Sequence, residues 1–273
     1  MLDRTLPRPA HFRPWRALML TLISALAFLS ALNLVLLALI NADQPIKAPS
    51  GTLLYVSTFD DDPDTDADDS FNAQWAQYAG QDSAMIADGI LYLSIGSPGG
   101  VFSDLDYPFA DVDVEVLAGW QDGEPDVIEA AEISLMFRYQ DVDNFYAFKL
   151  RGDGAYRAER RQSGTLDVLS EWQIAPQALS GPGAFNRLRV VAQGDQLRFF
   201  LNDQPVLLCP KGADRRSTWN GLRSAQCLSN NRQTADVLID SALKTGKIAL
   251  GAVAGQGATG FRVAFDNVIV LAP

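Results

Sequence analysis

The sequence predicts an all-β protein, an antiparallel β-sandwich preceded by one transmembrane helix. Three observations support this fold class. Residues 17–40 form 24 consecutive positions without a charged side chain. Beyond residue 52, short stretches alternate apolar and polar residues, the period of a strand with one buried face. Gly, Asp, Asn and Pro separate these stretches, as turns between strands require.

The first 40 residues predict a signal-anchor. Residues 1–16 form a basic tail with four arginines, and residues 17–40 exceed the roughly 7–15 apolar residues of a secretory signal peptide. About 20 apolar residues cross a bilayer core as a helix. Positive charge on one side places the N-terminus in the cytoplasm and the remaining chain outside, in a single pass across the cell membrane. A small-residue site ending at Ala42 leaves cleavage open.

The charge of the remaining chain excludes several functions. Residues 41–273 carry 18 basic and 32 acidic side chains, a balance that disfavours binding to nucleic acid because phosphates must be neutralised. The single histidine, His11, lies in the basic tail. The extracytoplasmic part therefore has neither a His-based metal site nor a Ser-His-Asp triad.

After a polar linker at residues 41–51, residues 52–273 are expected to form the sandwich. Four stretches alternate clearly, and each is expected to bury one face in an antiparallel sheet: 111–116, 132–139, 187–192 and 196–201. In the second stretch, Phe137 and Tyr139 are expected to face one way, and Met136 and Arg138 the other.

Turn residues join the strands. Gly194-Asp195 and Asn202-Asp203 predict tight hairpins. Arg151-Gly152-Asp153 has the sequence of an adhesion motif, but two glycines flank Asp153 between two aromatic-rich strands. This pattern favours a hairpin corner.

The segments "FADVDVEV", "ISLMFRYQDVDNFYAFKLRGDGAYRAERR", "GAFNRLRVVAQGDQLRFFLNDQPV", "TGKIALGAVA" and "VAFDNVIV" follow one another in a familiar order. Residues 52–273 resemble the concanavalin A-like lectin/glucanase superfamily, in the branch with LamG-like and 3-keto-disaccharide hydrolase-like domains. The resemblance implies a jelly-roll sandwich and a lectin-like, carbohydrate-related function. Phe185 replaces the family's usual Trp, and Asn202-Asp203 replaces its usual Asn-Gly.

Against that family, residues 209–234 look like an insertion. Cys209 and Cys227 are the only cysteines, and in an oxidising compartment they are expected to form one disulfide that closes the insertion. A loop held on a rigid sandwich is a candidate for recognition. The alternative is that the insertion is a variation within the family without a specific function.

Asp111, Asp113 and Glu115 are the candidate catalytic residues. Strand alternation places their carboxylates on one face, about 6.5–7 Å apart along the strand. Retaining glycosidases use two carboxyls about 5–5.5 Å apart. Laminarinase-like members of the superfamily carry such groups on a strand. The alternative is a solvated strand face.

A second acidic feature has seven aspartates within residues 60–69. Such a density of like charge is expected to be solvated or to bind a cation. The resemblance implies a structural calcium ion where the first and last strands meet, with Asp60 and Asp266 as ligands. A flexible acidic loop is the alternative.

Four residues are candidates for ligand binding. Trp120 and Trp219 stand in loop-like contexts where an exposed ring can stack on a sugar. Arg138 and Arg189 lie on polar strand faces, where they line a groove or pair with carboxylates across the sheet. Core packing is the alternative for each tryptophan.

These observations predict a membrane-anchored extracytoplasmic binding module, non-catalytic and specific for carbohydrate. Two alternatives remain. One is a glycoside hydrolase or an enzyme that cleaves 3-keto-glycosides; the other is a protein-interaction module of the cell envelope without sugar affinity.

Overall fold

The computed structural model describes residues 26, 28–30, 48–60, 74–210, 217–218 and 235–273. The chain divides into two compact units, Met1–Gln44 and Pro45–Pro273. The predicted anchor, residues 17–40, falls almost wholly outside the described residues. Among those that are described, the structure contains no helix with the length and apolar character needed to cross a membrane.

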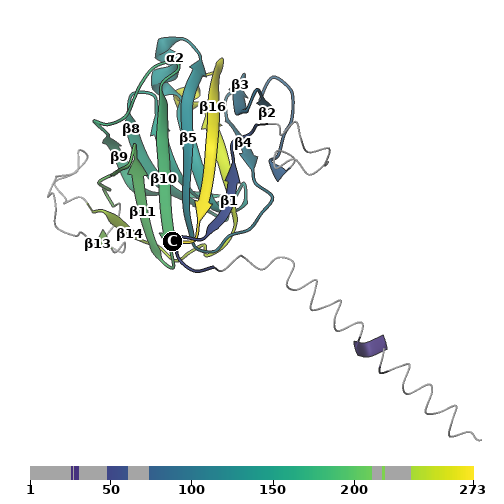
Figure 1. The fold of residues 1–273 in the computed structure, drawn as a ribbon. Helices are drawn as coiled ribbons and strands as arrows, with labels where there is room; N and C mark the ends of the chain where they lie inside the picture. The colour runs from purple at the N-terminus through teal and green to yellow at the C-terminus, as the bar shows by residue number, and fades with distance from the viewer. Residues whose placement is uncertain (1–25, 27, 31–47, 61–73, 211–216, 219–234) are drawn as a thin grey trace, which may run out of the picture. The chain divides into compact units, whose positions relative to one another are not determined.

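The second unit is a sandwich of two antiparallel sheets (Figure 1), as the alternation predicts. The larger sheet has ten strands in the described residues, in the order β13-β14-β11-β10-β5-β16-β3-β2, with β1 paired to β16 and β12 paired to β11. Its strands are β1 (Leu53–Ser57), β2 (Ser83–Ala87), β3 (Ile90–Ile95), β5 (Val112–Asp122), β10 (Phe185–Gln193), β11 (Gln196–Leu201), β12 (Gln204–Pro205), β13 (Ser217–Thr218), β14 (Val237–Ile239) and β16 (Phe261–Leu271).

Within the part of the chain that the structure describes, the smaller sheet has six strands in the order β4-β15-β6-β7-β8-β9. Its strands are β4 (Gly100–Asp104), β6 (Glu132–Asp141), β7 (Asn144–Arg151), β8 (Ala155–Gln162), β9 (Thr165–Ile174) and β15 (Lys247–Val253). The second unit also contains the short helix α2 (Pro125–Ala130) and the 3₁₀ turn η2 (Gly255–Gly257). Helix α2 connects β5 of one sheet to β6 of the other.

The core lies between the sheets and contains the apolar residues that the alternation assigned to it. On the large sheet these are Val112, Val114 and Val116 of β5, Leu188, Val190 and Ala192 of β10, and Leu197, Phe199 and Leu201 of β11. The small sheet contributes the alternate residues of β6, β7 and β8. Each of these strands buries one face, so the opposite face of each sheet is an outer face.

Strand β6 departs from simple alternation at Arg138. Its backbone has φ 48°, and the pairing with β7 shifts register between Phe137 and Asp141. A bulge adds one residue to a strand and so reverses the facing of the residues after it. Arg138 therefore turns inward and Tyr139 turns outward. The predicted facing of these two residues is wrong.

The Arg-Gly-Asp sequence forms the corner between β7 and β8. The backbone N–H of Gly152 donates to the carbonyl of Ala131, and a side chain at this position would overlap the carbonyl oxygen of Ile128 in α2. Arg151 donates two hydrogen bonds to Asp153, from Nε at 3.0 Å and from Nη2 at 2.6 Å. The two charged residues of the motif are thus bound to each other, and the hairpin-corner prediction is confirmed.

The insertion lies largely outside the described residues. Trp219 and Cys227 belong to that part. Cys209 is fully buried, and its backbone N–H donates to the hydroxyl of Ser170 in β9 at 2.8 Å. The Cys209–Cys227 pairing stays a prediction.

Candidate functional site

The outer face of the six-stranded sheet carries an unusual set of side chains. Register places Ser134 of β6 beside Lys149 of β7, and Lys149 beside Arg157 of β8. One rung along, Ala147 lies beside Glu159 of β8. Residues two positions apart on a strand share a face, so all of these side chains point away from the core.

A buried charge cluster occupies one half of this face. The Nζ of Lys149 lies 3.0 Å from a carboxylate oxygen of Glu132 and 2.7 Å from one of Glu159. Arg157 pairs with the second oxygen of Glu159 at 2.7 Å. Lys149 is 7% exposed and Glu159 is 2% exposed. Burying charges costs several kcal/mol per ion even in pairs, so this cluster is not an ordinary solvated sheet face.

Trp172 of β9 borders the charge cluster. The guanidinium carbons of Arg151 and Arg157 each lie 4.6 Å from the centre of its ring. Cation–π contacts of this kind hold both arginine side chains in place. Trp172 therefore fixes the donors of Arg157 beside the buried carboxylates.

The other half of the face carries an apolar cluster, bordered by Lys247 of β15, which pairs in register with Tyr139 and forms an ion pair with Asp104 of β4 at 2.9 Å. Met136, Tyr139, Ala147 and Ala249 form a cluster separate from the core, with Phe102 and Phe145 packed against it. The rings of Phe102 and Tyr139 are 5.6 Å apart, and those of Tyr139 and Phe145 are 6.1 Å apart. We call Phe102, Tyr139 and Phe145 the aromatic strip.

Strand β15 allows the aromatic strip to form. It lies between β4 and β6, and Gly251 pairs with Phe102 on one side and Ser134 on the other. A Cβ at Gly251 would come within 2.7 Å of the methyl group of Met136. The small residues of β15 thus let side chains of β4 and β6 meet above it.

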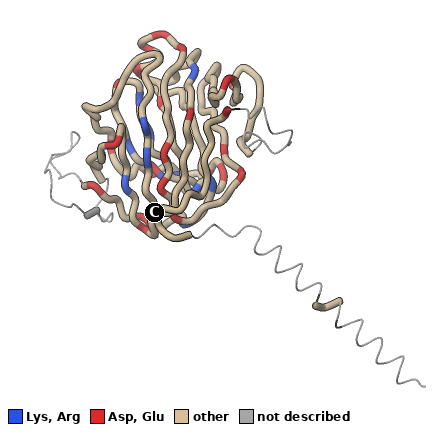
Figure 2. The backbone as a smooth tube through the Cα atoms, in the orientation of Figure 1, with Lys and Arg blue, Asp and Glu red and all other residues tan. Residues whose placement is uncertain are grey.

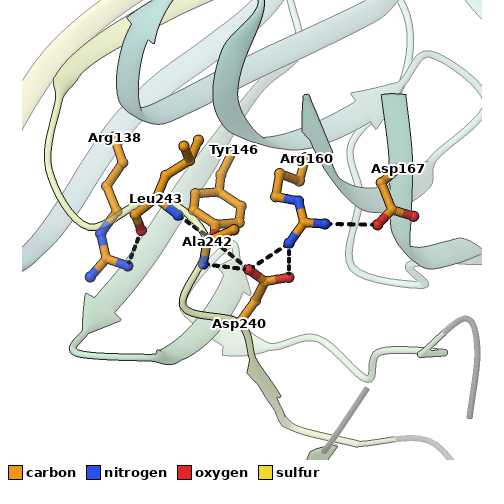
Figure 3. A network of polar contacts seen from close by, with 7 residues as sticks. All are labelled: Arg138, Tyr146, Arg160, Asp167, Asp240, Ala242 and Leu243. Atoms are coloured by element: carbon orange, nitrogen blue, oxygen red, sulfur yellow. Dashed lines mark hydrogen bonds and ion pairs between the residues drawn. The ribbon is translucent and has the colours of Figure 1, made fainter. Parts of the chain in front are cut away.

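A second polar network holds the loop after β14 (Figure 3). The hydroxyl of Tyr146 donates to Asp240 at 2.6 Å, and Arg160 donates to both oxygens of Asp240 and to Asp167. Burial opposes ionisation of Asp240, but hydrogen bonds from Tyr146, the Ala242 backbone and Arg160 lower its pKa. The network fastens the loop at residues 240–243 to strands β7 and β8, a structural role.

The outer face of the ten-stranded sheet carries the predicted carboxylates. Basic positions follow one another along β10 in Figure 2, next to β5. Arg189 forms two hydrogen bonds of 2.6 Å with Asp113 and lies 5.0 Å above the ring of Phe200. Arg187 pairs with Glu115 at 3.2 Å. Each of the two carboxylates pairs with an arginine of the neighbouring strand β10. A catalytic role for them stays a prediction.

Two of the ligand-binding candidates are buried. Trp120 lies in β5 and is 1% exposed, so its expected loop position is wrong. Arg138 is 2% exposed and donates to the carbonyl oxygens of Ala110, Leu243 and Gly194, and to Asp111. It joins three loops to β6, and a surface ligand cannot reach it. Arg189 is accessible, and Trp219 is outside the described residues.

Asp60 and Asp266 are neighbours, as the calcium prediction requires. Burial raises the pKa of Asp266, and the charge of Asp60 raises it further. Calcium takes six to eight oxygen ligands. Within the described residues no group of three or more His, Cys, Asp or Glu is placed to hold a metal ion. These two carboxylates could supply some of the oxygen ligands of a calcium ion but not the full set, and the calcium ion stays a prediction.

Sequence reasoning missed the charge cluster. Glu132 and Lys149 are visible as polar residues in alternating strands, but alternation alone does not place them together. Only the order β6-β7-β8 brings Glu132, Lys149 and Glu159 together. The detectable signal was a charged residue flanked by apolar ones at Lys149, in "YAFKL".

Comparison with known families agrees with this architecture. The model of the 3-keto-alpha-glucoside-1,2-lyase-like domain matches residues 56–270. The chain belongs to this family. No curated protein sequence matches the chain.

Solved structures share the fold at low identity. The carbohydrate binding module CBM66 from Bacillus subtilis has a TM-score of 0.50 and 16% identity, covering 72% of this chain and 95% of that one. A native glycosidic hydrolase has a TM-score of 0.51 and 9% identity, covering 83% and 99%. A beta-1,3-1,4-glucanase derived from a mouse hindgut metagenome has a TM-score of 0.50 and 10% identity, covering 80% and 99%. At these identities the likeness establishes the β-sandwich fold.

Proposed function

We propose that the protein binds carbohydrate, without cleaving it, on the outer face of its six-stranded sheet. The observation that carries this proposal is the buried charge cluster beside the aromatic strip. Sugar hydroxyls both donate and accept hydrogen bonds; Arg157, whose side chain is 18% exposed and paired with Glu159, offers fixed donors, and Glu132 offers an acceptor. Aromatic rings pack against the apolar CH face of a sugar ring.

Three comparisons support a sugar ligand. The family is described as 3-keto-alpha-glucoside-1,2-lyase-like, one structural neighbour is a carbohydrate binding module, and another is a glucanase. Binding without cleavage is favoured by Lys149, which forms ion pairs with both Glu132 and Glu159. A glycosidase needs one of its two carboxyls protonated, and protonation here would break an ion pair.

The test is retention of the full-length protein in native gels that contain a panel of polysaccharides, with and without calcium. The chain offers a matched pair of variants. Arg157 and Arg189 each pair with a carboxylate and lie over an aromatic ring, on opposite outer faces. We expect Arg157→Met to abolish retardation by the bound glycan and Arg189→Met to retain it.

If Arg189→Met abolishes the retardation and Arg157→Met retains it, the binding site lies on the ten-stranded sheet. No retardation by any polysaccharide would remove the sugar proposal. The protein-interaction module of the cell envelope would then be the better description.

A second candidate function is glycoside cleavage. Glu132 and Glu159 contact the same ammonium, so their two nearest oxygens are no further apart than the sum of those contact distances. That spacing is shorter than the roughly 6.5–9.5 Å of inverting glycosidases and compatible with a retaining pair. Release of reducing sugar by the wild type, lost in Glu159→Gln with binding intact, would establish an enzyme. Loss in Glu115→Gln instead would assign the chemistry to β5.

We further propose that residues 17–40 anchor the protein in the cell membrane, with the sandwich outside. The support is the uncharged stretch and the four arginines before it. Protease added to intact spheroplasts should digest the sandwich, and a chain lacking residues 1–40 should lose its membrane association. Protection of the sandwich in intact spheroplasts would reverse the orientation.

A further inference from the structure

The aromatic strip and the charge cluster occupy different halves of one sheet face. Glu132 and Tyr139 stand at opposite ends of the same stretch of β6, and each residue of a strand advances it by about 3.3 Å. These far ends are therefore on the order of 20 Å apart, but the halves meet at Ala147 of β7, which pairs with Glu159 and stands two residues, about 7 Å, from Phe145. Met136 and Ala147 lie between the two halves. A single ligand that covers the face must match a polar half and an apolar half.

The polar half is balanced in charge. Lys149 and Arg157 provide two positive charges, and Glu132 and Glu159 provide two negative charges, all joined in ion pairs. An anionic sugar would leave one charge uncompensated in a site where the groups are already buried. This half therefore fits an uncharged sugar.

The three rings of the aromatic strip carry one polar atom, the hydroxyl of Tyr139, and the ion pair of Lys247 with Asp104 lies at their border. Burial, with the charges of Asp104 and Asp141 and against the opposing charge of Lys247, raises the pKa of Tyr139 to about 12, so the phenol is neutral at physiological pH. Three rings with centres 5.6 and 6.1 Å apart suit the tilted or edge-on packing of another aromatic or apolar group.

We propose that the ligand is an uncharged sugar joined to an apolar aglycone, such as an aryl glycoside. The sugar lies over the charge cluster, and the aglycone packs against Phe102, Tyr139 and Phe145. This inference rests on the proposed carbohydrate function and names the class of ligand. It also predicts that carboxylated or sulfated sugars bind worse than their neutral counterparts.

The experiment compares matched glycosides. Binding of methyl and 4-nitrophenyl glycosides of glucose, galactose, mannose and xylose is measured by calorimetry with the full-length protein, in a detergent without a sugar headgroup. For the sugar that binds, we expect the 4-nitrophenyl glycoside to bind about tenfold tighter than the methyl glycoside. Tenfold corresponds to about 1.4 kcal/mol, within reach of one well-packed ring.

Substitutions in the aromatic strip test whether the tighter binding of the 4-nitrophenyl glycoside arises there. Phe145→Ser should reduce the tenfold preference to about twofold, because the lost ring is one that packs against the 4-nitrophenyl group. Phe200→Ser is the matched control, because Phe200 is also a partly buried phenylalanine on an outer sheet face. Phe102→Ser repeats the test on a different strand if Phe145→Ser does not fold.

The outcomes separate this inference from the proposed function. Equal affinity for both forms of a sugar that binds would overturn the aglycone site and keep the carbohydrate function. Binding of neither form, together with no retention by polysaccharides, would overturn both. A preference that persists in Phe145→Ser and Phe102→Ser, or binding of 4-nitrophenol alone at the same affinity, would also overturn the inference.

Discussion

Substitution of Lys149 by methionine should destabilise the sandwich strongly. The variant keeps a side chain of similar length but removes the ammonium that contacts Glu132 at 3.0 Å and Glu159 at 2.7 Å. Glu159 retains Arg157 as a partner, whereas Glu132 loses its ion pair while 8% exposed. Removing one partner of a buried ion pair costs about 3–5 kcal/mol, and the retained pair with Arg157 places the expected loss near the lower value.

The assay is thermal and chemical unfolding at neutral pH. For a domain of this size, about 3 kcal/mol corresponds to a drop in Tm of roughly 6–12 °C.

A second substitution isolates the cause. Glu132→Gln in the Lys149→Met background removes the unpaired charge and should recover more than 1 kcal/mol. Arg161→Met is the control, because Arg161 is an exposed cation on the neighbouring strand and its distance to Asp143 is 3.9 Å. A loss of stability below 1 kcal/mol in Lys149→Met, or no recovery in the double variant, would refute the buried-charge interpretation.

Three further predictions concern the frame around the site. Gly152→Ala should cost at least about 2 kcal/mol in a denaturant titration, because its Cβ would overlap the backbone carbonyl of Ile128; a neutral result would mean that α2 can shift. Arg138→Met should cost about 3 kcal/mol by the same measurement, since it leaves three loop carbonyls without their donor, and a loss within error would show that these loops do not depend on it. Calcium should raise the Tm of wild type. Without calcium, Asp266→Asn should raise the Tm at pH 7. The raised pKa of Asp266 means that its ionised form destabilises the folded state; this cost is present above the unfolded value of 3.8 and is relieved as pH falls through the folded pKa. A wild-type Tm that does not change with calcium would remove the metal site.

The strands were predictable from sequence because their signal is local. In β5, β10 and β11 one face is buried, so valine and leucine recur at every second position and reveal both the strand and its inward face. The hairpin at Asn202-Asp203 was predictable for the same reason. Both residues have positive φ, 49° and 64°, which a tight two-residue turn requires and which Asn and Asp tolerate.

The sequence predictions failed where backbone geometry overrides the local pattern of apolar and polar residues. The bulge at Arg138 reverses the facing of Tyr139, and apolar periodicity carries no signal for it. Trp120 looked like a loop residue because Gly119 precedes it. The structure gives a different reason for a glycine at position 119: a Cβ there would approach the carbonyl oxygen of Ala184 to 2.6 Å. The glycine permits close passage of two strands and does not end β5.

The candidate site could not be assembled from sequence. Glu132, Lys149 and Glu159 come from three strands, and their contact depends on register between neighbours in the small sheet. A shift of one residue in β7 would turn Lys149 toward the core. Alternation identifies which residues share a face of one strand, but it does not identify which strands are adjacent.

The position of β16 has a consequence for biogenesis. Residues 261–271 are the last strand along the chain, yet they lie between β5 and β3 and also pair with β1. Until they are synthesised, β5 and β3 have unpaired edges in the middle of the larger sheet. Unpaired strand edges associate readily with other chains. A nascent chain of this protein therefore cannot close its larger sheet before residues 261–271 have emerged from the ribosome.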